Sequence, residues 1–418
     1  MISRSFSYRF QAYILPQEVA EWHIIETGGP FKGGMKVSYI DTLLRQATLG
    51  KLNLKNRIVR SATMLSGAEE KTGKPTDKLI GRYKELAAGG VGLIITGHLY
   101  VSPQGQASPR QVSISSDENV PELAKLVEAV HEFGCPIIFQ ISHAGAVAMK
   151  KEGELALGPS DLKDPNKGIH CRAMTVSEIH STIDDFAKAA KRAKAANADG
   201  IQVHLAHGFL LNQFLSPILN KRKDAYGGDD IIKRARIVFE LLEELRYRVG
   251  ELPIWVKISV TEGIEGGYDS LDGIRLAEEL AKMKADAIEV SGGTFYGDDA
   301  LKPSRTGIIA GQNEGYFAEE ARAIKEKIKT HANVILVGGL RSLQTMGNFY
   351  EKGVADGFGL SRPLIAEPDL VNRWASGDRE SSECISCNAC SRLIKTGLVY
   401  CPVMRDAAEG TWAPPPEC

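Results

Sequence analysis

Residues 198–217 read ADGIQVHLAHGFLLNQFLSP, and this stretch decides the expected fold. Its run over 200–205 is short, β-branched and apolar, and it follows a helical pattern after only two linking residues. Runs that are apolar on both faces and separated by helices predict a parallel sheet covered by helices. The segment that follows this run, over 206–228, is much longer than the link before it.

The same unit recurs along the chain from residue 57 onward. Short apolar runs alternate with helical periodicity. The runs are 57–62, 91–96, 136–141, 200–205, 253–259, 286–291, 333–338 and 356–361. Eight such units favour an α/β fold of the (β/α)8 TIM-barrel type. An open doubly wound sheet would carry a Gly-x-Gly-x-x-Gly turn after its first strand, and none is present.

Two helices between these runs have clear signatures. Thr175 and Glu178 form a capping box at the start of one helix. Its expected buried face consists of Ile179, Ile183, Phe186, Ala187 and Ala190, and a second helix places Phe317, Ala321, Ile324 and Ile328 at the same spacing.

Connection lengths locate the expected site. Helix-to-strand links are short, whereas several strand-to-helix links are long. The long ones are 63–75, 97–118, 142–174, 206–228 and 293–313. Chemistry is therefore expected at the carboxyl ends of the strands.

Composition excludes several classes of partner. The 418 residues are 43% hydrophobic and 25% charged, as in soluble globular proteins. Lys plus Arg (51) nearly cancels Asp plus Glu (52), so no field attracts nucleic acid. No apolar stretch approaches the roughly 18 residues of a membrane span. A small-molecule substrate is expected.

The chain divides into three expected parts. Residues 1–39 show no convincing period and are expected to be a disordered or poorly packed extension rather than a transit peptide. Residues 40–378 form the barrel, and 379–418 form a cysteine-rich tail. Seven cysteines, unevenly placed, do not make a secreted disulfide scaffold, so a reducing cytoplasm is expected.

His204 and His207 follow the fourth run, three residues apart. As a metal site the pair lacks a nearby third ligand. As hydrogen-bond donors, the two imidazoles would polarise a carbonyl or nitro oxygen and stabilise the negative charge that develops on it.

Two other strands carry isolated polar residues. Gln140 offers a donor and an acceptor, which suits the edge of a heteroaromatic ring, although a satisfied core amide is the plainer interpretation. Lys257 lies inside an apolar strand, which is costly unless the lysine faces an anion. We therefore expect it to be the charge partner of an electron-rich ring.

The last two strand ends favour a phosphate site. Gly338 and Gly339 allow close approach of backbone N–H groups, and Ser361 and Arg362 follow the eighth run. Together these residues indicate a phosphorylated planar cofactor.

These motifs resemble the Old Yellow Enzyme family of FMN-dependent ene-reductases, including the barrel domain of its 2,4-dienoyl-CoA reductase branch. The similarity covers about residues 40–375. Its specific parts are Leu54 to Val59, Gly89 to Ile95, Gln140 with His143-Ala144-Gly145, and the run from His207 through Ser216-Pro217 and Asn220 to Asp224-Ala225-Tyr226-Gly227-Gly228.

The resemblance implies FMN as cofactor and NAD(P)H as reductant. It implies the following positions: Ser61 and Ala62 under the flavin, Gln140 at its pyrimidine edge, Lys257 near N1 and O2, Arg234 flanking the cofactor, and Gly338, Gly339, Ser361 and Arg362 at the phosphate. His204 and His207 match the pair that binds the activating oxygen of the substrate. The implied reaction is hydride transfer from flavin N5 to an activated C=C bond of an enone, an enoate or a dienoyl thioester.

Two departures stand out. The family's proton-donating tyrosine is replaced by Phe209, which cannot donate a proton. The residue near flavin N5, threonine or cysteine in many relatives, corresponds to Met64, or to Thr63 if the register shifts.

Cys384, Cys387, Cys390 and Cys401 form a compact thiolate set. Four cysteines suit an iron–sulfur cluster or a structural zinc, with unmodified thiols as the third alternative. The dienoyl-CoA reductase branch carries a 4Fe–4S cluster on a similar tail with slightly longer spacings. We favour iron–sulfur, and expect it to exchange electrons with a separate protein or to serve structure only.

Two rival functions stay open. One is oxidation or demethylation of an amine, as in the trimethylamine-dehydrogenase-like branch, with electrons leaving through the cysteine-bound cluster. The other is a non-catalytic flavin-binding electron-transfer module. A homo-oligomer is expected in each case.

Overall fold

The computed structural model describes residues 39–150, 153–164, 169–297 and 301–408. The predicted extension over 1–39 therefore lies outside the described residues, except for Tyr39 at the start of helix α1 (Tyr39–Leu43).

All eight predicted strands are present. In chain order they are β3 (Ile58–Arg60), β4 (Leu93–Ile95), β6 (Ile137–Ser142), β10 (Gly200–Leu205), β11 (Ile254–Ser259), β12 (Ala287–Ser291), β13 (Asn333–Leu336) and β14 (Gly357–Leu360). Neighbouring strands pair in parallel, and pairing of β10 with β6 closes the ring. The predicted TIM barrel is confirmed.

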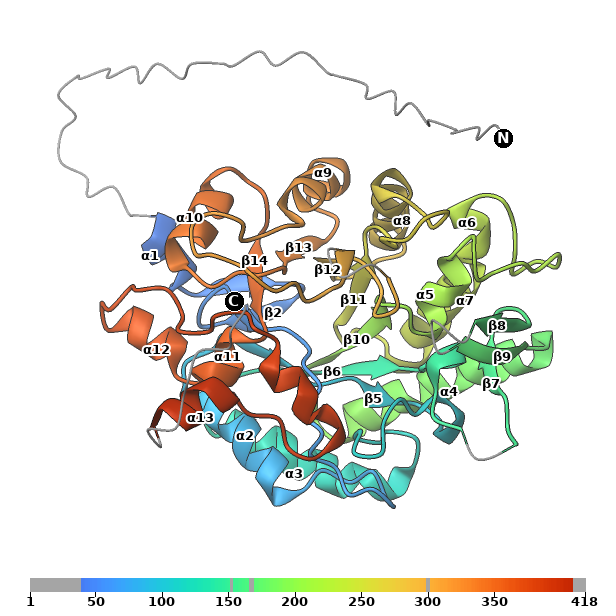
Figure 1. Ribbon diagram of the computed structural model, residues 1–418, viewed down its shortest axis with the longest axis horizontal. Helices are drawn as coiled ribbons and strands as arrows, with labels where there is room; N and C mark the ends of the chain where they lie inside the picture. The colour runs from blue at the N-terminus through green and yellow to red at the C-terminus, as the bar shows by residue number, and fades with distance from the viewer. Residues whose placement is uncertain (1–38, 151–152, 165–168, 298–300, 409–418) are drawn as a thin grey trace, which may run out of the picture. The chain divides into compact units, whose positions relative to one another are not determined.

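Helices surround this barrel (Figure 1). The longer ones are α2 (Asp77–Ala88), α3 (Val120–His131), α4 (Val176–Ala195), α7 (Arg236–Val249), α8 (Ser270–Lys282), α9 (Ala318–Ile328) and α10 (Leu343–Glu351). Thr175 and Glu178 form the predicted capping box of α4, and its predicted apolar face is buried. The predicted face of α9 is likewise buried.

Shorter elements lie in the connections. They are the hairpin β1 (Ala47–Leu49) and β2 (Leu52–Leu54), strand β5 (Leu99–Tyr100) beside β6, the three-stranded sheet of β7 (Ala156–Gly158), β8 (Leu162–Asp164) and β9 (Ile169–Ala173), and helices α5 (Leu210–Leu215), α6 (Ile231–Arg234), α11 (Pro363–Ala366), α12 (Leu370–Ala375) and α13 (Pro402–Ala408).

The amino-terminal end of the barrel is closed by apolar packing. Trp255 is fully buried there, and its indole N–H donates to the carbonyl of Gly50 at 3.2 Å. Leu49 and Leu54 of the hairpin belong to the same buried cluster. The polar residues that face into the barrel therefore lie toward its opposite, carboxyl end.

In the part of the chain that the structure describes, no helix is both long and apolar enough to cross a bilayer.

Candidate functional site

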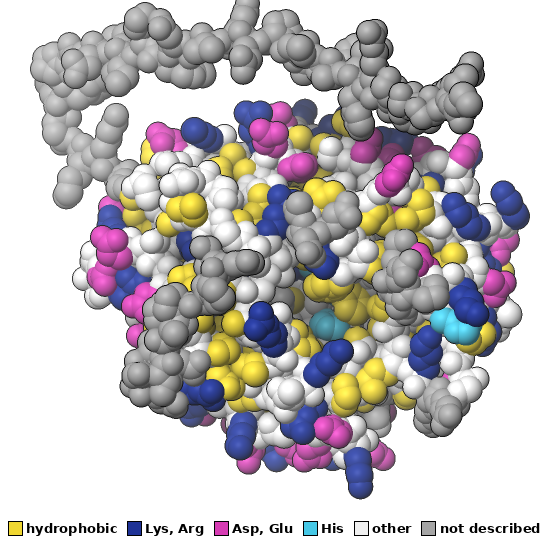
Figure 2. All heavy atoms as spheres, in the orientation of Figure 1, with side chains coloured by type: hydrophobic (Ala, Val, Ile, Leu, Met, Phe, Trp, Pro, Cys, Tyr) yellow, Lys and Arg dark blue, Asp and Glu magenta, His cyan; other side chains and the backbone are white. Residues whose placement is uncertain are grey.

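A cavity of about 230 Å³ lies at the carboxyl ends of the strands. Near the middle of this face, histidine and hydrophobic side chains lie together, with lysine and arginine side chains beside them (Figure 2). The structure brings nearly all the predicted residues to this one cavity. They are Ser61, Ala62, Gln140, His204, His207, Lys257, Gly338, Gly339, Ser361 and Arg362.

Arg234 is the exception. It is buried on α6, and its guanidinium donates to the carbonyls of Leu215 and Gly228 at 2.7 and 3.1 Å. It does not line the cavity. Its observed contacts hold the loop that follows β10.

A chain of buried polar side chains crosses the barrel below the cavity. The Gln140 amide donates to Gln202 at 2.6 Å, and the Gln202 amide donates to Glu289 at 2.7 Å. The other Glu289 oxygen accepts from Lys257 Nζ at 3.0 Å and from the Ser61 hydroxyl. The Lys257 ammonium also donates to Ser61 at 2.9 Å.

Strand register explains this chain. His204, Lys257 and Glu289 are partners across β10, β11 and β12, so their side chains lie on the same face of the sheet. Gln140 and Gln202 are partners across β6 and β10, and Gln202 lies two residues before His204. Residues two apart on a strand face the same side, which aims all five inward.

Lys257 was expected to face an electron-rich ring, and its nearest anion is the carboxylate of Glu289. Glu289 and Gln202 were not among the residues predicted from the sequence. The sequence carries the same signal for Glu289 as for Lys257, because both are charged residues in the middle of a buried strand.

His207 is fixed by its backbone and by serine contacts. It adopts a left-handed φ of 65°, its N–H donates to Ser259 Oγ at 2.9 Å, and its Nε2 lies 2.8 Å from Ser291 Oγ. His204 is 3% exposed, and its Nδ1 has no hydrogen-bond partner within the described chain. The two rings lie 5.2 Å apart.

Both histidines are held neutral. Burial lowers the pKa of each well below its usual value, and the positive charge of Lys257 lowers both further. Neutral imidazoles can donate a hydrogen bond to a carbonyl oxygen without carrying charge into the cavity.

Phe209 and His98 complete this end. The Phe209 ring lies 4.8 Å from His204 and 4.9 Å from His98, and both Phe209 and His98 line the cavity. Met64 and Thr63 also line it. His98, which lies two residues beyond the second predicted strand, was not among the residues predicted from the sequence.

The other end of the cavity is cationic. Gly338 and Gly339 adopt φ values of 118° and 73°, and a Cβ on either would come within about 3 Å of the Tyr316 ring. Arg341 and Arg362 line the same end. Burial lowers the pKa of Arg341, and the charge of Arg362 adds to this effect.

These guanidiniums contact neutral acceptors. Arg362 donates to the carbonyls of Arg305 and Ser386 at 2.7 and 3.3 Å and to Asn388 Oδ1 at 2.6 Å. Arg341 contacts the hydroxyl of Ser386, and its Nε has no partner in the described residues. Within those residues neither guanidinium forms a salt bridge, which leaves this end suited to an anion.

The four tail cysteines line one small, separate cavity, and Cys390 also borders the main one. All four are free thiols, and burial raises the pKa of Cys390 to about 11. Among the described residues, no three His, Cys, Asp or Glu side chains are arranged to hold a metal ion.

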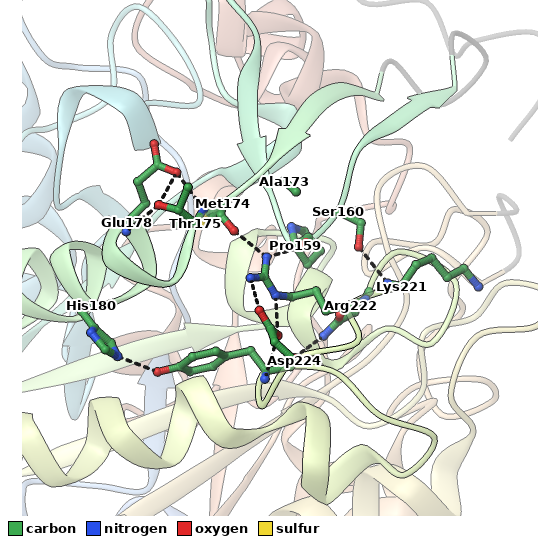
Figure 3. A network of polar contacts seen from close by, with 12 residues as sticks. Pro159, Ser160, Ala173, Met174, Thr175, Glu178, His180, Lys221, Arg222 and Asp224 are labelled. Carbon is green, nitrogen blue, oxygen red and sulfur yellow. Dashed lines mark hydrogen bonds and ion pairs between the residues drawn. The ribbon is translucent and has the colours of Figure 1, made fainter.

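Part of the loop after β10, around Arg222 and Asp224, has a structural role (Figure 3). Arg222 pairs with Asp224 and donates to the carbonyls of Pro159 and Met174 at 2.9 and 2.6 Å. It thereby ties this loop to the segment that precedes α4. None of these four residues lines the cavity.

The family model described as NADH:flavin oxidoreductase / NADH oxidase matches residues 43–380. An NADH oxidase of Thermoanaerobacter brockii is 34% identical over 358 residues, which cover 84% of this chain and 54% of that protein. An NADPH dehydrogenase of Halalkalibacterium halodurans is 36% identical over 323 residues, covering 76% and 89%. The solved structure of a 2-naphthoyl-CoA reductase complex has a TM-score of 0.81 at 25% identity, covering 90% of this chain and 58% of that one.

Proposed function

This chain belongs to the NADH:flavin oxidoreductase / NADH oxidase family, and we propose that it is an FMN-dependent, NAD(P)H-consuming reductase of activated C=C bonds. The resemblance to Old Yellow Enzymes is thereby confirmed at the level of the family. The chain spans about half the length of the NADH oxidase that it matches.

One observation carries the proposal. A single cavity has two neutral histidines at one end and two arginines without a carboxylate partner, among the described residues, at the other. Such a cavity suits a long ligand whose phosphate lies at the arginine end. A second molecule with an uncharged, hydrogen-bond-accepting oxygen would then lie at the histidine end.

The residues present fit FMN. Arg341 and Arg362, with the close-approach backbone at Gly338 and Gly339, would hold the phosphate. The Gln140 amide N–H is committed to Gln202, which leaves its carbonyl oxygen to accept from a ring N–H. Lys257, although paired with Glu289, would keep positive charge at the ring edge. When bound, FMN supplies hydride transfer from NAD(P)H to the β-carbon of the substrate.

The protein's own contribution is orientation and electrostatics. His204 and His207 would each donate a hydrogen bond to the activating oxygen and stabilise its developing negative charge. His207 is held by Ser259 and Ser291, so its donor is positioned before substrate binds. Because Phe209 cannot donate a proton, the α-carbon would take its proton from water or from another group.

The test begins with FMN content. Protein as purified, or mixed with FMN, should show flavin absorption and reduce 2-cyclohexenone with NADH or NADPH. His204→Ala and His207→Ala should each lose most enone turnover while retaining FMN, because their side chains contact the substrate. Wild-type rates in both variants would refute the assigned role.

The site favours C=C reduction over amine oxidation. Among the described residues, no aspartate or glutamate lines the cavity, so an ammonium group would find no counter-ion there. Anaerobic reduction of the flavin by an amine, without nucleotide, would reverse this preference. No turnover with any donor or acceptor, despite bound FMN, would support the non-catalytic flavin-module alternative.

For the tail we propose thiolate ligation of an iron–sulfur cluster, with zinc as the alternative. The support is that all four cysteines border one cavity. Their arrangement is not that of a metal site, so no step of the reaction is assigned to it. Iron and zinc analysis of anaerobically purified protein distinguishes the cluster from zinc. About four irons per chain would support the cluster. An electron-transfer partner, homo-oligomerisation and a cytoplasmic location remain predictions.

A further inference from the structure

His98 is a third histidine in the same cavity as His204 and His207. It follows β4, and its ring centroid lies 6.0 Å from that of His204. Phe209 packs 4.9 Å from His98 and 4.8 Å from His204. Nothing in the proposed role of the His204/His207 pair requires this additional imidazole.

Hydrogen bonds fix the tautomer of His98. The backbone N–H of Ala107 donates to Gln111 Oε1 at 2.7 Å, which identifies Gln111 Nε2 as the amide NH₂ group. Gln111 Nε2 lies 2.9 Å from His98 Nδ1 and 3.0 Å from the His98 carbonyl. Since an NH₂ group can only donate, Nδ1 must accept, and the ring proton of the neutral form resides on Nε2.

The ring is also held in place and kept uncharged. Ser142 Oγ, at the end of the neighbouring strand β6, contacts Nδ1 at 3.0 Å. Burial lowers the pKa of His98 to about 4, so at neutral pH the imidazole is uncharged. A neutral imidazole is a weak acid but a good hydrogen-bond donor, and its role is therefore binding rather than proton transfer.

We propose that His98 Nε2–H forms a second oxygen-binding subsite beside the His204/His207 pair. The inference rests on the proposed function and deepens it by assigning a further specificity-determining residue to the same site. Acceptors with two hydrogen-bond-accepting oxygens flanking one C=C bond, such as cyclic imides and ene-diones, would occupy both subsites. A simple enone would occupy only the His204/His207 pair.

Two variants of the FMN-loaded protein test this. His98→Phe keeps a ring of similar size but removes the donor, and His98→Gln keeps a side-chain N–H. His98→Phe should lower the kcat/KM for maleimide, relative to that for 2-cyclohexenone, about fivefold, which is the worth of one hydrogen bond between neutral groups. His98→Gln should recover much of the maleimide rate. Equal losses for both substrates, or no loss for either, would overturn the subsite.

A second measurement does not depend on turnover. The ¹⁵N NMR signals of histidine in the FMN-loaded protein should show His98 protonated at Nε2 and not at Nδ1. Succinimide, an inert two-oxygen ligand, should shift the Nε2 signal of His98, and cyclohexanone should leave it nearly unchanged. A proton on Nδ1, or no response to succinimide, contradicts the subsite. Failure of the wild type to reduce either acceptor contradicts the proposed function instead, and the titration then still decides the subsite.

Discussion

Lys257 and Glu289 show what a buried charge requires at the scale of single residues. Their side chains are 6% and 0% exposed, and the charged atoms lie 3.0 Å apart. Removing one partner leaves the other charge buried without compensation, whereas removing both does not. A double substitution therefore reports the net contribution of the pair to the free energy of unfolding. A single substitution mainly reports the cost of leaving one buried charge unpaired.

We expect Glu289→Leu to destabilise the protein by about 3–5 kcal/mol, because Lys257 is left buried and unpaired. The double variant Lys257→Met/Glu289→Leu should lose clearly less. Urea unfolding followed by circular dichroism measures the free energies of the double variant and of both single variants, Glu289→Leu and Lys257→Met. A double variant as unstable as the sum of the two single variants would show that the pair is not coupled.

Glu262, in the loop after β11, is a buried carboxyl group outside the proposed chemistry. Its two oxygens make no well-formed hydrogen bond within the described chain, and burial raises its pKa to about 7 against the weaker opposing effects of Ser216, Tyr268 and Arg234. The folded state therefore binds a proton that the unfolded state releases between pH 4.5 and about 7, so stability falls as pH rises through this window.

Glu262→Gln should remove this pH dependence. The amide is neutral at every pH, so the variant should gain up to roughly 3 kcal/mol over the wild type at about pH 8.5 and little at about pH 5. Unfolding curves at the two pH values measure the difference. An equal effect at both would mean that the carboxyl group is not protonated in the folded protein.

Sequence patterns identify single residues when they break a local rule. Lys257 can be recognised in the sequence because lysine is rare in a buried strand. Glu289 carries the same signal, because it is also a charged residue in a buried strand. His98 breaks no rule, since a histidine in a loop is ordinary. Its role depends on Gln111 and Ser142, whose proximity is not a property of the local sequence.

At the scale of elements, the capping box of α4 was predicted and is formed. Thr175 Oγ1 accepts from the Glu178 N–H at 3.2 Å, and the Glu178 carboxylate accepts from the Thr175 N–H at 2.8 Å. Thr175→Ala should cost about 1 kcal/mol. Thr175→Ser, which keeps the acceptor, should cost much less in the same thermal or urea unfolding experiment, and equal losses would argue against capping.

The elements that escaped prediction lack a strong local signal. In the β1–β2 hairpin both central turn residues, Gly50 and Lys51, have positive φ. A turn of this kind is usually recognised by the sequence Asn-Gly or Gly-Gly. Here its second position is a lysine, so the sequence does not predict the turn. The eight barrel strands were found because each is apolar and bounded by helical periodicity.

At the scale of the whole molecule, the cysteine-rich tail contributes to the wall of the cavity. Ser386, Asn388, Cys390, Ile394 and Val399 line the same cavity as the strand ends. The Ser66 hydroxyl also donates to the Ile394 carbonyl at 2.7 Å. No periodicity or motif encodes a contact between segments some 300 residues apart, so only the fold shows it.

This contact makes the tail part of the proposed phosphate site. Asn388 Oδ1 accepts from Arg362 at 2.6 Å, and the Asn388 amide donates to the Ser304 carbonyl at 3.0 Å, so Asn388 fixes the arginine from the tail side. Asn388→Ala should weaken FMN binding about five- to tenfold, less than the full worth of a hydrogen bond to a charged group, because Arg362 keeps its contacts with the carbonyls of Arg305 and Ser386. Fluorescence titration of FMN into apoprotein measures this, with Asn372→Ala, whose amide donates to the Ala88 carbonyl away from the cavity, as the matched control. An unchanged Kd for Asn388→Ala would mean that Arg362 is positioned by the barrel alone and that the tail only covers it.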